Sequence, residues 1–360
     1  MVRAEPKPGR RRATPPSRRS ERTAPVPQRP RPPVTTPTAI RLARVVWFVA
    51  FLAALTAVVL PWTAYDTPPV LPLAGAVGLT TVYTLALAVR AGGRPWISGG
   101  LALALCTAAA VSGSEVMLAG AAVGTAVVAG VLAVLATAPA ARFVGVVREV
   151  AIATVVAAAG AFAVRAYDAQ LSLERTGYLA IGLSLLGALT LVYRLGAGLH
   201  GLGRRGSVMI VGGVGLLTLT LAYTEALAHW GSPGLIESVD RVLMSVRDLV
   251  GAVPRPIEVL LGFPALAWGV STRARRRQGW WVCAFGAPGL AVVAVSLLDP
   301  GTTLGGAGLT VLYSVLLGLA VGYAVIRADL FLTGARGRRA RRLEEMAAHR
   351  PEAQRLEPLL

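Results

Sequence analysis

Ten stretches of this sequence are apolar and close to the length that an α-helix needs to cross a lipid bilayer, about 17–25 residues. Because the hydrocarbon interior offers no partners for backbone hydrogen bonds, such stretches are expected to form membrane-spanning helices. They are residues 45–62, 70–89, 96–112, 117–138, 144–164, 178–193, 207–229, 257–272, 280–298 and 305–326. The pattern predicts an all-α integral membrane protein with about ten transmembrane helices.

Composition agrees with this fold class. Of the 360 residues, 54% are hydrophobic and 15% are charged, whereas a soluble domain carries about a quarter charged residues. The count of ten helices depends on four stretches. Three of these, 96–112, 178–193 and 257–272, are short for a bilayer, and the fourth, 144–164, carries the charged pair Arg148 and Glu149.

The charges predict the orientation of the bundle. The formal net charge is +18, from 36 basic and 18 acidic residues. With the N-terminus in the cytoplasm, the connections on the cytoplasmic side hold 11 basic residues and one acidic residue, while the outer segments hold five basic and ten acidic residues. Short cytoplasmic loops of membrane proteins are enriched in arginine and lysine. We therefore expect a multi-pass protein of the plasma membrane with both termini in the cytoplasm.

Two basic tails flank the bundle, which is expected to occupy residues 45–326. Residues 1–44 are rich in arginine and proline, with 12 basic and two acidic residues, a composition typical of a disordered cytoplasmic tail. Residues 327–360 form a second basic cytoplasmic tail, with eight basic and five acidic residues. Such tails attract anionic lipid headgroups. No aromatic residues alternate with the arginines as in a nucleic-acid-binding module, so the predicted partners are membrane lipids and not nucleic acid.

One outer segment, residues about 233–251, is predicted to form an amphipathic helix. Apolar residues recur there at spacings of three and four, and charged residues occupy the other positions. This pattern is typical of a helix with one apolar face. Its charged face argues against a span, so we expect it to lie at the outer membrane interface or to cover the bundle.

Sequence motifs indicate no cofactor, metal or catalytic site. The glycines of 196–201 match the dinucleotide-binding pattern, but the match follows a predicted membrane helix instead of the required strand. Cys106 and Cys283 lie inside apolar stretches, where cysteine usually serves as a small packing residue. Gly120 and Gly124, and likewise Gly318 and Gly322, are four residues apart, a spacing that favours close packing of membrane helices.

Ionisable residues near or within the apolar stretches are the candidate substrate- or proton-binding residues, because charges are costly there unless paired or hydrated. Glu225 and His229 are one helical turn apart near the outer end of 207–229, and histidine titrates near neutral pH. Glu258 begins the stretch 257–272, and Arg148 with Glu149 lies near the cytoplasmic end of 144–164. The alternative for each is an interfacial side chain that reaches water.

Ten helices divide into two halves of five with opposite orientation, as in many inverted-repeat transporters. In this arrangement the chain is similar to the ten-helix drug/metabolite exporters. We expect transport or flipping of a small or lipid-linked solute, with Glu225, His229 and Glu258 lining an outward-facing polar site under the amphipathic helix. One alternative is a cell-envelope enzyme that acts on a lipid-linked substrate through outer carboxylates such as Asp66 and Glu225. Another is a non-catalytic scaffold whose tails recruit partners. The sequence leaves the oligomeric state open.

Overall fold

The computed structural model describes residues 37–63, 65–169, 172–194, 203–230, 233–275, 279–298, 302–333, 355 and 357–359. Every regular element in these residues is a helix. The chain divides into two units, residues 1–45 and 46–360. The first unit contains the start of α1, and the second contains the rest of α1 and all later elements.

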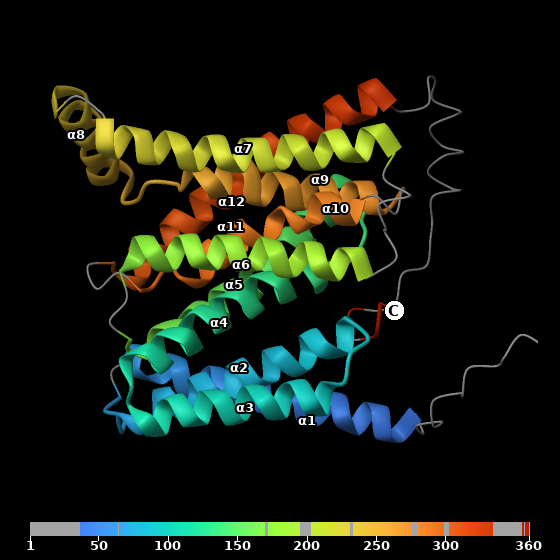
Figure 1. The fold of residues 1–360 in the computed structure, drawn as a ribbon, viewed down its shortest axis with the longest axis vertical. Coiled ribbons are helices and arrows are strands. Elements are labelled where there is room, and N and C mark those ends of the chain that lie inside the picture. Colours follow the sequence, from blue (N-terminus) through green and yellow to red (C-terminus); the bar gives the residue numbers. More distant parts are fainter. Residues whose placement is uncertain are drawn as a thin grey trace, which may run out of the picture. The chain divides into compact units, whose positions relative to one another are not determined.

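The elements follow one another in a simple order (Figure 1). They are α1 (Pro37–Val59), η1 (Leu60–Trp62), α2 (Val70–Arg90), α3 (Pro95–Ser112), α4 (Glu115–Leu135), α5 (Phe143–Ala166), α6 (Leu173–Arg194), α7 (Gly203–Trp230), α8 (Pro233–Val250), η3 (Glu258–Gly262), α9 (Phe263–Arg273), α10 (Gly279–Ala284), α11 (Gly286–Ala294) and α12 (Leu304–Thr333).

Seven helices in the described part of the chain are long and apolar enough to cross a membrane. They are α1 to α6 and α12, and they coincide with seven of the ten apolar stretches. An all-helical fold with several membrane-length helices is thus confirmed. The stretch 207–229 lies within α7, and the segment expected to be amphipathic forms α8. The helix α1 begins at Pro37 and α12 ends at Thr333, so both extend into the segments predicted as tails.

The stretches 257–272 and 280–298 each form one helical run that is interrupted locally, at the π-helical turn η3 before α9 and at the single turn residue Phe285 between α10 and α11. Pro264 has no N–H group to donate to the carbonyl of Leu260, and the turn before it is a π-helix, η3, in which Phe263 N–H bonds to Glu258 O. Pro288 likewise cannot donate to Ala284, where α10 ends. Both interruptions therefore follow from a proline inside an apolar run.

The interrupted helices lie in the middle of the unit (Figure 1). The helix α11 packs against α4, α5 and α6, while α9 packs against α10 and α12. Helices η3 and α11 touch through their backbones, because a Cβ atom added to Gly262 would lie 2.8 Å from the Cα atom of Gly289. Almost every residue from 261 to 297 that the structure describes is buried. Short helices are therefore enclosed here by long ones.

The two glycine pairs that were predicted to allow close helix packing, Gly120 with Gly124 and Gly318 with Gly322, have different surroundings. A Cβ atom on Gly318 would lie 2.6 Å from Phe263 Cβ, and one on Gly322 would lie 2.9 Å from Ala267 Cβ, so this pair allows α12 to approach α9 closely. At Gly120 and Gly124 an added Cβ meets no described atom within 4 Å. Helix packing through small residues is therefore found at only one of the two predicted places.

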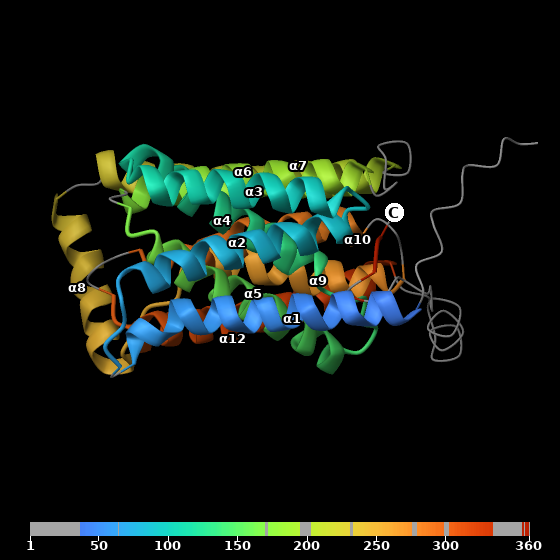
Figure 2. The ribbon, with the colours of Figure 1, turned by 90° about the horizontal axis from the view of Figure 1, so that it is seen from below.

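The helix α8 differs from the others in direction. Figure 2 shows it running across the ends of the neighbouring helices, on the side of the unit opposite the C-terminal residues. We call the side that carries α8 the α8 end, and the side that carries residues 355 and 357–359 the tail end. Polar side chains gather inside the unit at both ends.

Candidate functional site

The first polar cluster is reached through a non-helical segment that connects α8 to η3. Tyr313 OH donates to Val250 O at 3.0 Å, and Arg255 N–H donates to Ser314 Oγ at 3.0 Å. Ser314 is ten residues into α12, about 15 Å from the start of that helix at 1.5 Å per residue. The segment therefore enters the bundle beside α12. Irregular backbone at this depth is tolerated in a membrane only where protein encloses it or where it lines a hydrated cavity.

The segment places a buried carboxylate next to an arginine. Glu258, the first residue of η3, has a fully buried side chain, whereas that of Arg255 is 29% exposed. Arg255 Nη1 lies 3.5 Å from Glu258 Oε1 and donates to Val292 O, in the last turns of α11, at 3.3 Å. The second oxygen, Glu258 Oε2, is buried and has no hydrogen-bond partner in the described part of the structure. The Ser314 hydroxyl also interacts with this carboxylate, but it does not meet hydrogen-bond geometry with Oε2.

Two further buried donors lie along α9. Trp268 Nε1 and Thr272 Oγ1 have no hydrogen-bond partner within the residues that the structure describes. They are four positions apart and so lie on one face of the helix. Leu261 and Ala265 belong to the same face, and with Trp268 they pack in a cluster that includes Leu217 of α7 and Phe285. Polar atoms that lack partners in a native interior call for an explanation.

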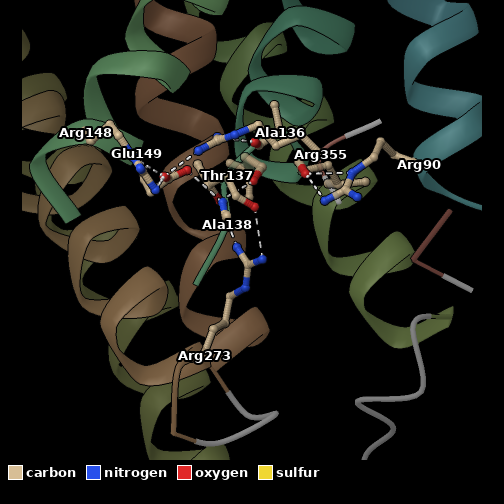
Figure 3. Close-up of polar contacts among 10 residues, drawn as sticks. Arg90, Ala136, Thr137, Ala138, Arg148, Glu149, Arg273 and Arg355 are labelled. Atoms are coloured by element: carbon tan, nitrogen blue, oxygen red, sulfur yellow. Dashed lines mark hydrogen bonds and ion pairs between the residues drawn. The ribbon is translucent and has the colours of Figure 1, made fainter. Parts of the chain in front are cut away.

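The second cluster surrounds the end of α4 (Figure 3). The last carbonyls of a helix have no partner within it and carry partial negative charge. Arg90, at the end of α2, donates to Leu135 O from Nε at 3.0 Å and from Nη2 at 2.8 Å. Arg273, at the end of α9, donates to Thr137 Oγ1 at 2.8 Å and to Thr137 O at 3.1 Å. Its guanidinium also lies over the ring of Trp280, 3.5 Å from the centroid.

A third arginine completes this arrangement and brings in Glu149 of α5. Arg355 Nη1 donates to Ala136 O at 2.9 Å, and Arg355 Nη2 lies 2.5 Å from Glu149 Oε1. The same oxygen pairs with Arg148 Nη2 at 2.9 Å, and Ala138 N–H donates to Glu149 Oε2 at 2.8 Å. The Glu149 side chain is fully buried, whereas that of Arg148 is 66% exposed. We call the three carbonyl groups of residues 135–137, with Arg90, Arg273 and Arg355, the arginine cap.

Backbone contacts hold the C-terminal residues against the same end of the bundle. Leu359 N–H donates to Arg90 O at 3.0 Å, and Arg90 Nη1 donates to Glu357 O at 2.8 Å. The Leu359 side chain packs against the large core cluster. Arg90 thus binds the end of α4 and the C-terminal residues at once.

The structure separates the other candidates from these clusters. Glu225 of α7 is exposed and accepts a hydrogen bond from Tyr178 OH of α6 at 3.1 Å. The backbone of His229 belongs to α7, but its side chain lies outside the described residues. Glu225 and Glu258 therefore lie in different environments, one exposed and one fully buried.

From the sequence, Arg90, Arg273 and Arg355 were recognisable only as basic residues of segments expected to lie in the cytoplasm. Their signal was weak, because an arginine at the end of an apolar helix is also typical of an interfacial residue. Their common role depends on the end of α4, which is distant from each of them in the sequence. The pairing of Arg355 with Glu149 spans 206 positions.

No protein-family model, no curated protein and no solved structure matches the chain.

Proposed function

We propose that this chain transports or flips a small or lipid-linked solute across the plasma membrane, with Arg255 and Glu258 at its binding site. The observation that carries the proposal is the buried Glu258 carboxylate, one oxygen of which has no partner among the described residues. Ionisable groups within membrane bundles mark substrate or proton pathways. A proton or a hydrogen-bond donor of a solute would complete the interactions of this oxygen.

The interrupted helices support the proposal. In many transporters the substrate and ion sites lie where discontinuous helices meet, because free helix ends carry partial charges. Glu258 begins η3, and its partner Arg255 bonds to a carbonyl in the last turns of α11. The unpartnered groups of Trp268 and Thr272 extend the line of polar atoms along α9 toward the tail end. A solute or proton would find donors and an acceptor along this line.

We further propose ten membrane crossings with both termini in the cytoplasm. In this topology α7, the run from η3 to α9, and the pair α10 and α11 add three crossings to those of the seven long helices. The distribution of arginine supports placing the tail end in the cytoplasm, where the basic tails would contact anionic lipids. Glu225 and His229 would then lie toward the outer side, near α8, and would take part in proton coupling.

Native mass spectrometry of the full chain in detergent tests the proposed site through any solute or lipid that co-purifies with it. We expect a bound molecule in the wild-type protein and its loss in Glu258→Gln and Arg255→Ala. A suitable control is Glu237→Gln, which removes the carboxylate of an exposed pair, Glu237 and Arg241, four positions apart on α8. Retention of the molecule in Glu258→Gln, or its loss in the control to the same extent, would contradict the proposed site.

A further inference from the structure

We propose that the tail end of the bundle is a binding site for an arginine-containing peptide, and that the C-terminal segment, residues 355 and 357–359, is its resident ligand. The inference stands independently of the proposed transport function, because it rests on contacts at the opposite end of the bundle. Those contacts resemble the way in which a protein binds a separate peptide.

The site binds the C-terminal segment in three ways: through the Arg355 side chain, through hydrogen bonds to backbone groups of the segment, and through the apolar side chain of Leu359. The Arg355 guanidinium bonds to the Glu149 carboxylate and to the carbonyl of Ala136. Two backbone hydrogen bonds to Arg90, from Leu359 N–H and to Glu357 O, fix the direction of the segment. The Leu359 side chain then packs against the core. A charged anchor, backbone pairing and an apolar anchor together are typical of peptide recognition.

The occupied site joins three helices. Arg90 is the last residue of α2, Ala136 follows the end of α4, and Glu149 lies in the second turn of α5. Arg355 connects α4 with α5, and Arg90 connects the segment with α2 (Figure 3). The bound segment therefore acts as a latch that adds to the contacts between these helix ends, and its release removes the Arg355 bridge between α4 and α5.

The partners of Glu149 point to a detachable segment. When Arg355 leaves, Glu149 keeps Ala138 N–H and the Arg148 guanidinium, and so it does not become an isolated buried charge. Leu135 O likewise keeps both of its bonds from Arg90. Release removes the Arg355 donor from Ala136 O, but Glu149 and Leu135 O keep partners, so the site can exist with and without its ligand.

Cysteine labelling of the full chain tests the inference. Leu359→Cys introduces a thiol into the C-terminal segment, while the native thiols of Cys106 and Cys283 are buried and give little background. Adding Arg355→Ala removes the bonds to Ala136 O and to Glu149 Oε1, and it should raise the rate of maleimide labelling at position 359 by at least about tenfold, since the loss of even one charge-assisted hydrogen bond accounts for that factor. Arg148→Ala is the control, because it removes another guanidinium that pairs with Glu149 and leaves the C-terminal segment unchanged. It should change the labelling rate by less than about twofold.

A competition experiment avoids any change in the site. A synthetic peptide of residues 350–360, added at about millimolar concentration to compete with the tethered segment, should accelerate labelling of Leu359→Cys. The same peptide with Arg355→Ala should not. Equal labelling rates with both peptides, or with and without Arg355 in the chain, would overturn the proposal. Transport plays no part in either readout, so this result is separate from the test of the proposed function.

Discussion

Arg273 donates two hydrogen bonds to a single residue, Thr137, one to its side-chain hydroxyl and one to its carbonyl oxygen. Thr137 Oγ1 in turn donates to Val134 O at 2.7 Å. The last turn of α4 is thereby tied to the last turn of α9. Since α9 begins directly after η3, which carries Glu258, one short helical run connects the arginine cap with the Arg255–Glu258 pair.

The Arg273–Thr137 contact should be important for stability. Arg273→Ala leaves buried acceptors on Thr137 without a donor, and we expect it to lower the free energy of unfolding by about 3 kcal/mol. The control is Arg165→Ala, which breaks the exposed ion pair with Asp168 and should change stability by less than about 1 kcal/mol. Thermal unfolding in detergent, followed by circular dichroism, measures both variants. Equal melting temperatures would show that the contact contributes no more than a surface ion pair.

The contact between η3 and α11 should be sensitive to a single methyl group. In Gly262→Ala the new Cβ would lie 2.8 Å from Gly289 Cα, so the helices must separate, at a cost of about 2 kcal/mol. Gly120→Ala is the matched control, because its Cβ meets no described atom within 4 Å and alanine favours a helix by about 0.5–1 kcal/mol. The two variants should shift the melting temperature in opposite directions. A neutral Gly262→Ala would mean that the helices have room to adjust.

Substitution of the exposed Glu225 tests whether this residue takes part in proton coupling, as proposed above. Glu225→Gln removes the ionisable group and should abolish transport while the protein still inserts into the membrane. Tyr178→Phe removes the hydroxyl that donates to Glu225 Oε2 and leaves the carboxylate in place, so it should slow transport less. The measurement is flux, in proteoliposomes, of the solute identified by mass spectrometry. Wild-type flux in Glu225→Gln would exclude this residue from the transport step.

The proposed orientation predicts a labelling pattern in intact cells. Glu237, on α8, and Arg94, between α2 and α3, are both exposed in the structure. A membrane-impermeant maleimide should modify Glu237→Cys in intact cells, whereas Arg94→Cys should react only after the membrane is opened. The reverse pattern would place the tail end outside the cell and would contradict the proposed topology.

The sequence predicted the long helices well, because hydropathy over about twenty residues is a local property. It did not predict the π-helical turn η3 or the turn at Phe285, although both prolines, Pro264 and Pro288, were visible inside the apolar stretches. A proline in a membrane helix often produces only a kink. The local irregularity that each proline produces here, enclosed by longer helices, depends on the neighbours that satisfy the free backbone groups.

The candidate site was likewise only partly predictable from the sequence. Glu258 was recognisable as an ionisable residue at the start of an apolar stretch, but its complete burial and its open oxygen depend on packing against α11 and α12. The partners of Glu149 were less predictable still. Arg148 is its neighbour in sequence, whereas Arg355 comes from the far end of the chain and reaches it only through the fold.

The residues of the arginine cap differ in whether their side chains are needed for its hydrogen bonds. Leu135 and Ala136 contribute only carbonyl oxygens to it, and every amino acid supplies a carbonyl. The guanidinium groups that bind these oxygens have no equivalent in another side chain, because lysine lacks the planar set of donors. Ala136 should therefore accept substitutions more readily than Arg90 and Arg355, whereas Leu135, which is fully buried in the core, should accept only apolar residues of similar size. A library of variants at these four positions would show this asymmetry directly.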